Sequence, residues 1–204
     1  MWVRVATFEG GDTEKLDQLM DERMSSGEMP PPEGMSSVLI LDDKDATKRK
    51  FFAFFESRDA LEAAEAGFDR QGDSIPEEIR GRRTSVHYYE VVIYDGDIGA
   101  AKAARVSLLE GSPEAIDAGI EKARGETLPK VRAISGNVGA VGLADRDTGR
   151  TSMITLWDSP DSMRASAHEA DQLRQRTADM SDQKITNVAL YDISRAQTVA
   201  SVQA

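Results

Sequence analysis

A strand-turn-strand pattern occurs twice in this 204-residue chain, 102 positions apart, and it limits the possible folds to those with two similar halves. The second copy, residues 139–159, reads GAVGLADRDTGRTSMITLWDS, and the first, residues 37–57, reads SVLILDDKDATKRKFFAFFES. The alignment pairs Leu41 with Leu143, Asp43 with Asp145, Asp45 with Asp147, Phe55 with Trp157 and Ser57 with Ser159. We interpret this pattern as an internal duplication with halves of roughly 95–100 residues, a common domain size.

Each half contains the same order of expected elements: strand, helix, strand, strand, helix, strand. The expected strands cover residues 2–8, 37–41, 50–55 and 86–94, and then 105–109, the hairpin within 139–157, and 185–191. Four helix starts are predicted at equivalent places, because Asp and Ser are favoured N-caps: Asp12, Ser57, Ser112 and Ser159. We therefore expect repeats at residues 1–95 and 104–196, a polar linker at 96–103 and a frayed tail at 197–204.

The strands indicate that both faces of each sheet are covered. An antiparallel sheet with one face in water alternates apolar and polar residues. Residues 51–55 (FFAFF) and 153–157 (MITLW) are apolar at both parities instead. The other repeat supplies the missing cover and removes exposed sheet edges. The expected fold class is α+β, with two ferredoxin-like β-α-β-β-α-β repeats forming an intramolecular, pseudo-dimeric α/β barrel of eight strands with four helices outside.

A glycine-rich segment, residues 136–142 (GNVGAVG), precedes the second hairpin. It lacks the G-x-G-x-x-G spacing of a dinucleotide site and the Lys of a P-loop, and it leads into a strand and not a helix. We interpret these glycines as positions of close backbone packing or of a β-bulge.

Charge and composition exclude several classes of function. A net charge of −11 argues against nucleic acid and anionic membrane surfaces as partners, because both require clustered Lys and Arg. The absence of Cys excludes disulfides and thiolate sites, and two His are too few for a His-rich metal site, so no metal is expected. No targeting segment or apolar run of about 20 residues is present, so the expected location is the cytoplasm.

The segment from Met153 to Met163, MITLWDSPDSM, combines a strand ending in an aromatic residue, an acidic residue and a helix-capping Ser. Phe51 to Leu61, FFAFFESRDAL, has the same layout. On these residues the chain resembles the antibiotic biosynthesis monooxygenase domain of the dimeric α/β-barrel superfamily. The resemblance implies a small-molecule pocket between each sheet and its own helices, no cofactor, and a fused chain in place of the usual homodimer, with further self-association possible.

Relatives of this kind include cofactor-independent monooxygenases of aromatic polyketides, haem-degrading oxygenases and proteins without known activity. The aromatic monooxygenases typically place an Asn four residues before the strand Trp, where this chain has Met153 and, in the first half, Phe51. The haem-degrading relatives place a Trp and a His on the following helix, where this chain has Ser166 and Arg176. These differences argue against haem degradation and leave the oxygenase reaction without its usual polar group.

Four residues are candidates for the substrate pocket, while the catalytic residues stay unknown. Trp157 could stack on an aromatic substrate or be a core residue whose indole N–H is bonded internally. His168 could exchange protons at the pocket edge or be a surface residue. His87, on the last strand of the first half, and Asn187, which aligns with Glu90, could line a pocket or decorate a strand edge.

Two hypotheses for function follow. The first is a cofactor-independent monooxygenase of aromatic or polyketide-like substrates, with its pocket around Trp157. The second is a non-catalytic ligand-binding or structural protein whose pockets are filled by apolar side chains, which the Phe-rich first half favours. A cavity of roughly several hundred Å³ beside Trp157, the size of ligand sites, with His168 or Asn187 turned inward would favour the enzyme.

Overall fold

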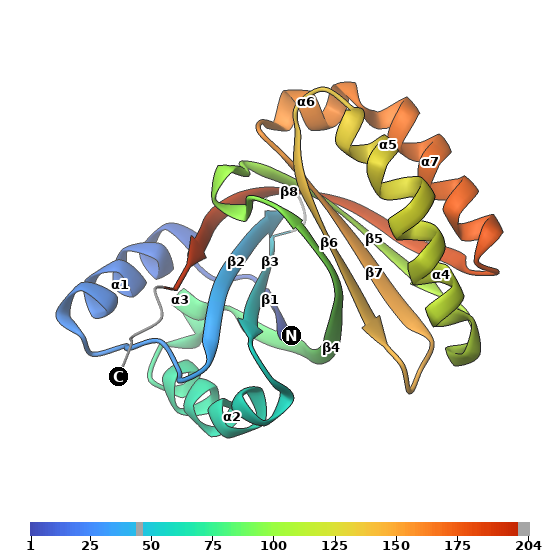
Figure 1. Cartoon of the computed structure of the whole chain (residues 1–204). Helices are drawn as coiled ribbons and strands as arrows, with labels where there is room; N and C mark the ends of the chain where they lie inside the picture. The colour runs from blue at the N-terminus through green and yellow to red at the C-terminus, as the bar shows by residue number, and fades with distance from the viewer. Residues whose placement is uncertain (44–46, 200–204) are drawn as a thin grey trace. The chain divides into compact units, whose positions relative to one another are not determined.

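A computed structural model describes residues 1–43 and 47–199, so Asp45, which the repeat pairs with Asp147, lies outside the described residues, as do residues 200–204. The fold is α+β, as expected: the strands follow the order β1-β3-β2-β8-β5-β7-β6-β4 and close as an eight-stranded antiparallel barrel. Two compact units are present: residues 1–88 with Thr198 and Val199, and Tyr89–Gln197 (Figure 1).

The first unit contains a β-α-β-β-α-β series with one additional short helix. Its elements are β1 (Trp2–Glu9), α1 (Thr13–Ser26), β2 (Met35–Asp43), β3 (Lys48–Phe55), α2 (Arg58–Asp73), α3 (Glu77–Arg80) and the start of β4 (Arg82–Gly96). Strand β3 lies between β1 and β2 and is antiparallel to both. Helix α2 packs on this sheet through Leu61 and Ala64, which contact Ala53 and Phe55.

The second unit has the same order, but its first helix is broken into pieces. Its elements are η1 (Ile98–Ala100), β5 (Ala103–Glu110), η2 (Pro113–Ala115), α4 (Ile116–Lys122), η3 (Ala123–Thr127), α5 (Leu128–Ala133), β6 (Asn137–Asp145), β7 (Arg150–Trp157), α6 (Pro160–Ala165), α7 (Ala167–Met180) and β8 (Lys184–Thr198). Strand β7 lies between β5 and β6, β8 pairs with β5, and the end of β4 pairs with β6. Figure 1 shows α4, α5 and α7 on one side of these strands.

Three of the four predicted caps make the expected hydrogen bond. The side chains of Asp12, Ser57 and Ser159 each accept a bond from the backbone N–H three residues later, all at 3.1 Å. Ser112 makes no such capping bond, because the chain enters a 3-10 turn at Pro113 before helix α4 starts. Ser112 is therefore the residue at the helix start, as predicted, but its side chain does not form the capping hydrogen bond.

The glycine-rich segment combines close backbone packing with a bulge, as predicted. The β6–β7 register shifts between Asn137 and Gly139. A Cβ added to Gly139 would lie 2.5 Å from the backbone oxygen of Asp95, so no side chain fits there. The β2–β3 register shifts between Met35 and Ser37, the equivalent place in the first half.

Strands β4 and β8 are longer than the sequence pattern indicated. Each has 15 residues: β4 starts at Arg82, four residues before the expected strand, and β8 extends to Thr198, past the expected start of the tail. The expected linker is also structured, since Asp97 caps a 3-10 turn in which Ile98 is buried. The prediction that both faces of the hairpin strands are covered is confirmed for β3, where Phe52, Ala53, Phe54 and Phe55 are all buried.

Candidate functional site

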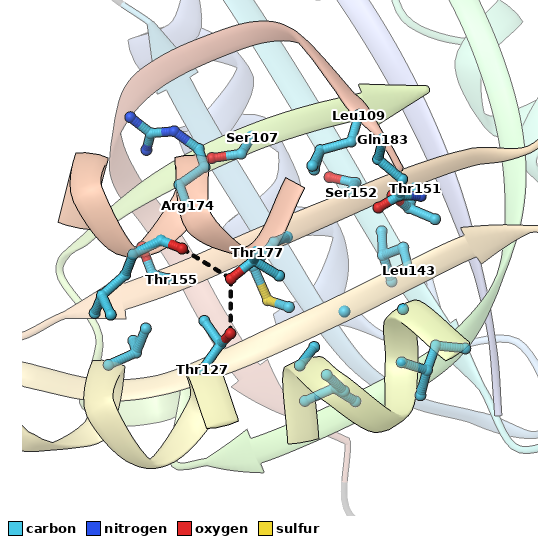
Figure 2. Close-up of a pocket in the computed structure, with 18 of the residues that line it drawn as sticks. Ser107, Leu109, Thr127, Leu143, Thr151, Ser152, Thr155, Arg174, Thr177 and Gln183 are labelled. Carbon is cyan, nitrogen blue, oxygen red and sulfur yellow. Dashed lines mark hydrogen bonds between the residues drawn. The ribbon is translucent and has the colours of Figure 1, made fainter. Parts of the chain in front are cut away.

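A cavity of about 100 Å³ lies within the second unit, between the helices and the sheet they cover (Figure 2). Strands β5, β6 and β7 form one wall, and α4, η3, α5 and α7 form the other. Most of the accessible wall is apolar. This location is the one implied by the family resemblance, although the volume is below the roughly several hundred Å³ expected of a substrate pocket.

The sheet wall follows the two-residue period of a β-strand, in which alternate side chains share one face. The lining residues of β5 are Arg105, Ser107 and Leu109, and those with the same parity on β7 are Thr151, Met153, Thr155 and Trp157. Strand β7 is thus apolar on both faces because one face packs in the core and the other lines this pocket.

The helical wall includes a π-turn, η3, that carries Ala123 and Thr127 into the lining. Pro129 follows directly and has no N–H for a regular α-helical bond, which explains the wider turn. Thr127 and Thr177 share a hydrogen bond of 2.6 Å between their hydroxyl oxygens, and Thr177 also donates to the Leu173 backbone oxygen at 2.8 Å (Figure 2). These bonds join η3 to α7 beside the cavity.

The first half shows why the second half has room. Phe68 on α2 meets the Phe55 ring edge to face, with 6.1 Å between centroids. The 102-residue offset of the repeat places Ala170 where the first half has Phe68, and Ala170 lines the cavity. A methyl group at this position leaves more space on the helical side of the sheet than a phenyl ring does.

Trp157 is fully buried and lines the pocket. It packs against Ala103, Ile134 and Met163, and its indole Nε1 donates to the hydroxyl of Thr155 at 3.1 Å. The residue therefore combines the two possibilities open from the sequence: it belongs to the core, and it presents a surface to the cavity. Its N–H is already paired with a neighbouring side chain.

Arg105 is a guanidinium in the pocket wall with only 3% of its surface exposed. It donates to the Met163 backbone oxygen at 2.6 Å and to Ser166 Oγ at 3.2 Å, and its Cζ lies 5.5 Å from the centroid of the Trp157 ring. Burial lowers the pKa of Arg105, the charge of Arg174 lowers it further, and Asp171 acts in the opposite direction. The group still stays protonated, because an arginine pKa is far above neutral pH.

The other predicted site residues lie outside the pocket lining. His168 is exposed on α7, where its Nε2 is 3.0 Å from Nε2 of Gln172. Asn187 is exposed on β8, and His87 is exposed on β4. The structure thus brings Trp157 to the cavity but does not bring His168, Asn187 or His87 to it.

Two kinds of feature were not found in the described part of the chain. No group of three or more His, Asp or Glu side chains there could hold a metal ion. No helix in residues 1–43 and 47–199 has the length and hydropathy required to cross a bilayer.

Sequence reasoning missed the charged and hydroxyl-bearing residues of the pocket: Arg105, Ser107, Thr127, Arg174 and Thr177. A signal for Arg105 was present, because an Arg occurs at the matching position of both first strands, Arg4 in VRVATFEG and Arg105 in ARVSLLEG. A charged residue repeated within an otherwise apolar strand requires buried polar contacts or a ligand. The contacts of Arg105 come from α6 and its junction with α7, which sequence spacing could not show.

Comparison with known proteins gives no matching family model. Two uncharacterized proteins of Mycobacterium tuberculosis match part of the chain. One is 34% identical over 80 residues, which is 39% of this chain and 34% of that protein. The other is 31% identical over 77 residues, or 38% of this chain and 34% of that protein. The match spans about a third of the length of these curated relatives.

Solved structures match almost the whole chain. An anthrone oxidase-like protein superposes with a TM-score of 0.68 at 15% identity, over 99% of this chain and 94% of the other. A ferredoxin-fold protein from Listeria monocytogenes, related to antibiotic biosynthesis monooxygenases, has a TM-score of 0.54 at 11% identity, over 95% of both chains. A heme-degrading enzyme from the same species has a TM-score of 0.56 at 12% identity, covering 94% of this chain and 99% of that one. The chain therefore has the ferredoxin-like, dimeric α/β-barrel fold of the anthrone oxidase-like and antibiotic biosynthesis monooxygenase-related proteins.

Proposed function

We propose that this chain is a small-molecule-binding protein whose ligand enters the pocket of the second half, and that the first half is a copy without a binding site. The observation that carries the proposal is the difference between Phe68 and Ala170 at equivalent positions. The ring of Phe68 packs on Phe55 in one half, whereas Ala170 borders a cavity in the other.

The size and lining of the cavity favour a compact ligand. A cavity of about 100 Å³ is comparable with the engineered apolar cavity of about 150 Å³ that binds benzene in another protein. One aromatic ring is therefore the size of ligand that the resting pocket accommodates, and a multi-ring polyketide would require the helices to move. Hydroxyls of Ser107, Thr155 and Thr127 supply hydrogen-bonding positions along a mostly apolar wall.

Oxygenation of an aromatic substrate is the second candidate, because an anthrone oxidase-like protein shares the fold. Such a reaction without cofactor begins when the enzyme removes a proton from the substrate, which needs a positioned base. Among the described residues that line the pocket, none is His, Asp, Glu, Lys or Tyr. Its ionisable residues are Arg105 and Arg174, whose guanidinium groups do not accept a proton. This geometry supports binding better than turnover.

Filling the cavity tests the proposal. We expect benzamide, a neutral single-ring probe, to bind the unmodified protein and to bind A170F at least tenfold more weakly, since the added ring occupies its site. A170S, which adds only a hydroxyl, should keep most of the affinity. Calorimetric titration of the three proteins measures the difference, and equal affinity for A170F and A170S would place any binding elsewhere.

Oxygen uptake separates binding from catalysis. We expect no uptake above the buffer rate with hydroxylated single-ring aromatics. Uptake by the unmodified protein that A170F abolishes would instead establish the oxygenase reaction in this pocket.

A further inference from the structure

The two halves carry an equivalent buried arginine in different electrostatic surroundings. In the first half, Arg4 is 5% exposed and forms a bidentate pair with Glu65: Nε to Oε2 at 2.9 Å and Nη2 to Oε1 at 3.1 Å. Its guanidinium also lies over Phe68, with Cζ 4.7 Å from the ring centroid. The charge of Arg4 is therefore neutralised within its own half.

Arg105 has no such counter-ion among the described residues. The 102-residue offset of the repeat places Ala167 where the first half has Glu65, so the carboxylate is missing. The acceptors that Arg105 contacts, the Met163 backbone oxygen and the Ser166 hydroxyl, are both neutral. Within residues 1–43 and 47–199, no carboxylate is paired with Arg105, and the nearby Asp171 is paired with Arg174.

A buried cation without a partner is costly, because the charge loses its hydration without gaining an opposite charge. A guanidinium has five N–H donors, and the two observed bonds use two of them. The other three N–H donors are on the same side chain, Arg105, which forms part of the cavity wall. Arg174, a second lining residue, adds positive charge at the same pocket.

We infer that the ligand of this pocket is a compact monocarboxylate whose carboxylate group pairs with Arg105. This inference rests on the proposed function, since it requires a ligand in the same cavity. A carboxylate fits the fork of a guanidinium and would take the place that Glu65 has beside Arg4. The apolar remainder of the wall would contact the body of the ligand, an aromatic ring or short hydrocarbon.

Because of the net charge of the chain, a preference for carboxylate ligands must arise from groups in the pocket itself. The chain carries a charge of −11, which repels anions at long range. Long-range attraction therefore cannot account for carboxylate binding, and any preference must come from the buried guanidinium. Salt screens interactions at the surface much more than it screens a buried pair, so the preference should persist at high ionic strength.

Benzoate and benzamide are a matched pair of probes, alike in shape and different in charge. We expect the unmodified protein to bind benzoate at least about tenfold more tightly than benzamide, the ratio that about 1.4 kcal/mol provides. In R105Q the ratio should fall to about one. Because Arg105 also holds α6 through Met163, a second variant, A167E, restores the missing carboxylate and leaves Arg105 in place. It should lose the benzoate preference in the same way.

The outcomes separate this inference from the proposed function. Binding of benzamide with no preference for benzoate would overturn the carboxylate inference but not the proposed function of the pocket. Binding of neither probe would overturn both. A benzoate preference that persists in A167E, and in R105Q if that variant folds, would place the anion away from Arg105 and also overturn the inference.

Discussion

At the scale of single residues, the indole of Trp157 depends on one neighbouring hydroxyl. Its Nε1 donates to Thr155 Oγ1 at 3.1 Å, and the ring is fully buried. A buried donor left without a partner costs about 1–3 kcal/mol. We therefore expect T155V, which keeps the branched shape and removes the hydroxyl, to lower the free energy of unfolding by that amount in urea titrations. T155S retains the hydroxyl and is the control; equal stability of the two variants would show that the indole N–H finds another partner.

Single residues also show which parts of the site can be predicted from the sequence and which cannot. Trp157 was identified as a pocket candidate because its strand motif is local and repeated. Arg105, on strand β5, was missed because its significance depends on which residue stands at position 167, on helix α7. His168 was a candidate for the pocket edge or the surface, and the structure places it at the surface, where it contacts Gln172.

Among the secondary-structure elements, two helix starts can be compared directly, because only one of the two predicted caps forms a capping hydrogen bond. The Ser159 side chain accepts from the Ser162 N–H at 3.1 Å, whereas Ser112 has no capping bond. Replacing a working cap by Ala costs typically about 1 kcal/mol. S159A should therefore destabilise the protein by about that amount, and S112A by much less. Chemical denaturation of both variants checks this, and equal losses would contradict the assigned capping geometry.

Element existence and order followed from the sequence, whereas element lengths did not. Strand, turn and capping signals are local, so the β-α-β-β-α-β order and the hairpin bulge could be predicted from residue types. The lengths of β4 and β8 depend on their neighbours in the barrel, which include strands far away in the sequence, and residue periodicity does not encode these neighbours. The π-turn before α5 likewise needs Pro129 to be considered together with the helix that precedes it.

At the scale of the whole molecule, the repeat makes each half a reference for the other. The halves share strand order, bulge position and a buried arginine, and they differ at two linked positions, Phe68 against Ala170 and Glu65 against Ala167. A ring and a carboxylate occupy one half, and the other has a cavity and a guanidinium that is paired with no carboxylate of residues 1–43 and 47–199. If these two differences determine where ligands bind, transferring them should move the site.

The transfer can be made in the A170F protein, whose own pocket is filled. F68A removes the ring that packs on Phe55 and should cost less than the roughly 3–5 kcal/mol of a fully buried Phe-to-Ala change, because Phe68 is half-buried. It should also create benzamide binding in the first half. Benzoate should not bind more tightly there than benzamide, because Arg4 remains paired with Glu65.

Adding E65A to A170F/F68A should then free the guanidinium of Arg4, leaving it in the position that Arg105 has in the second half. We expect the benzoate-to-benzamide affinity ratio to rise at least about tenfold on this third substitution, for the same charge-pairing reason. Calorimetric titration of the double and triple variants, with thermal unfolding to confirm that both are folded, measures the change. A folded triple variant with an unchanged ratio would mean that the missing carboxylate does not determine anion preference in either half.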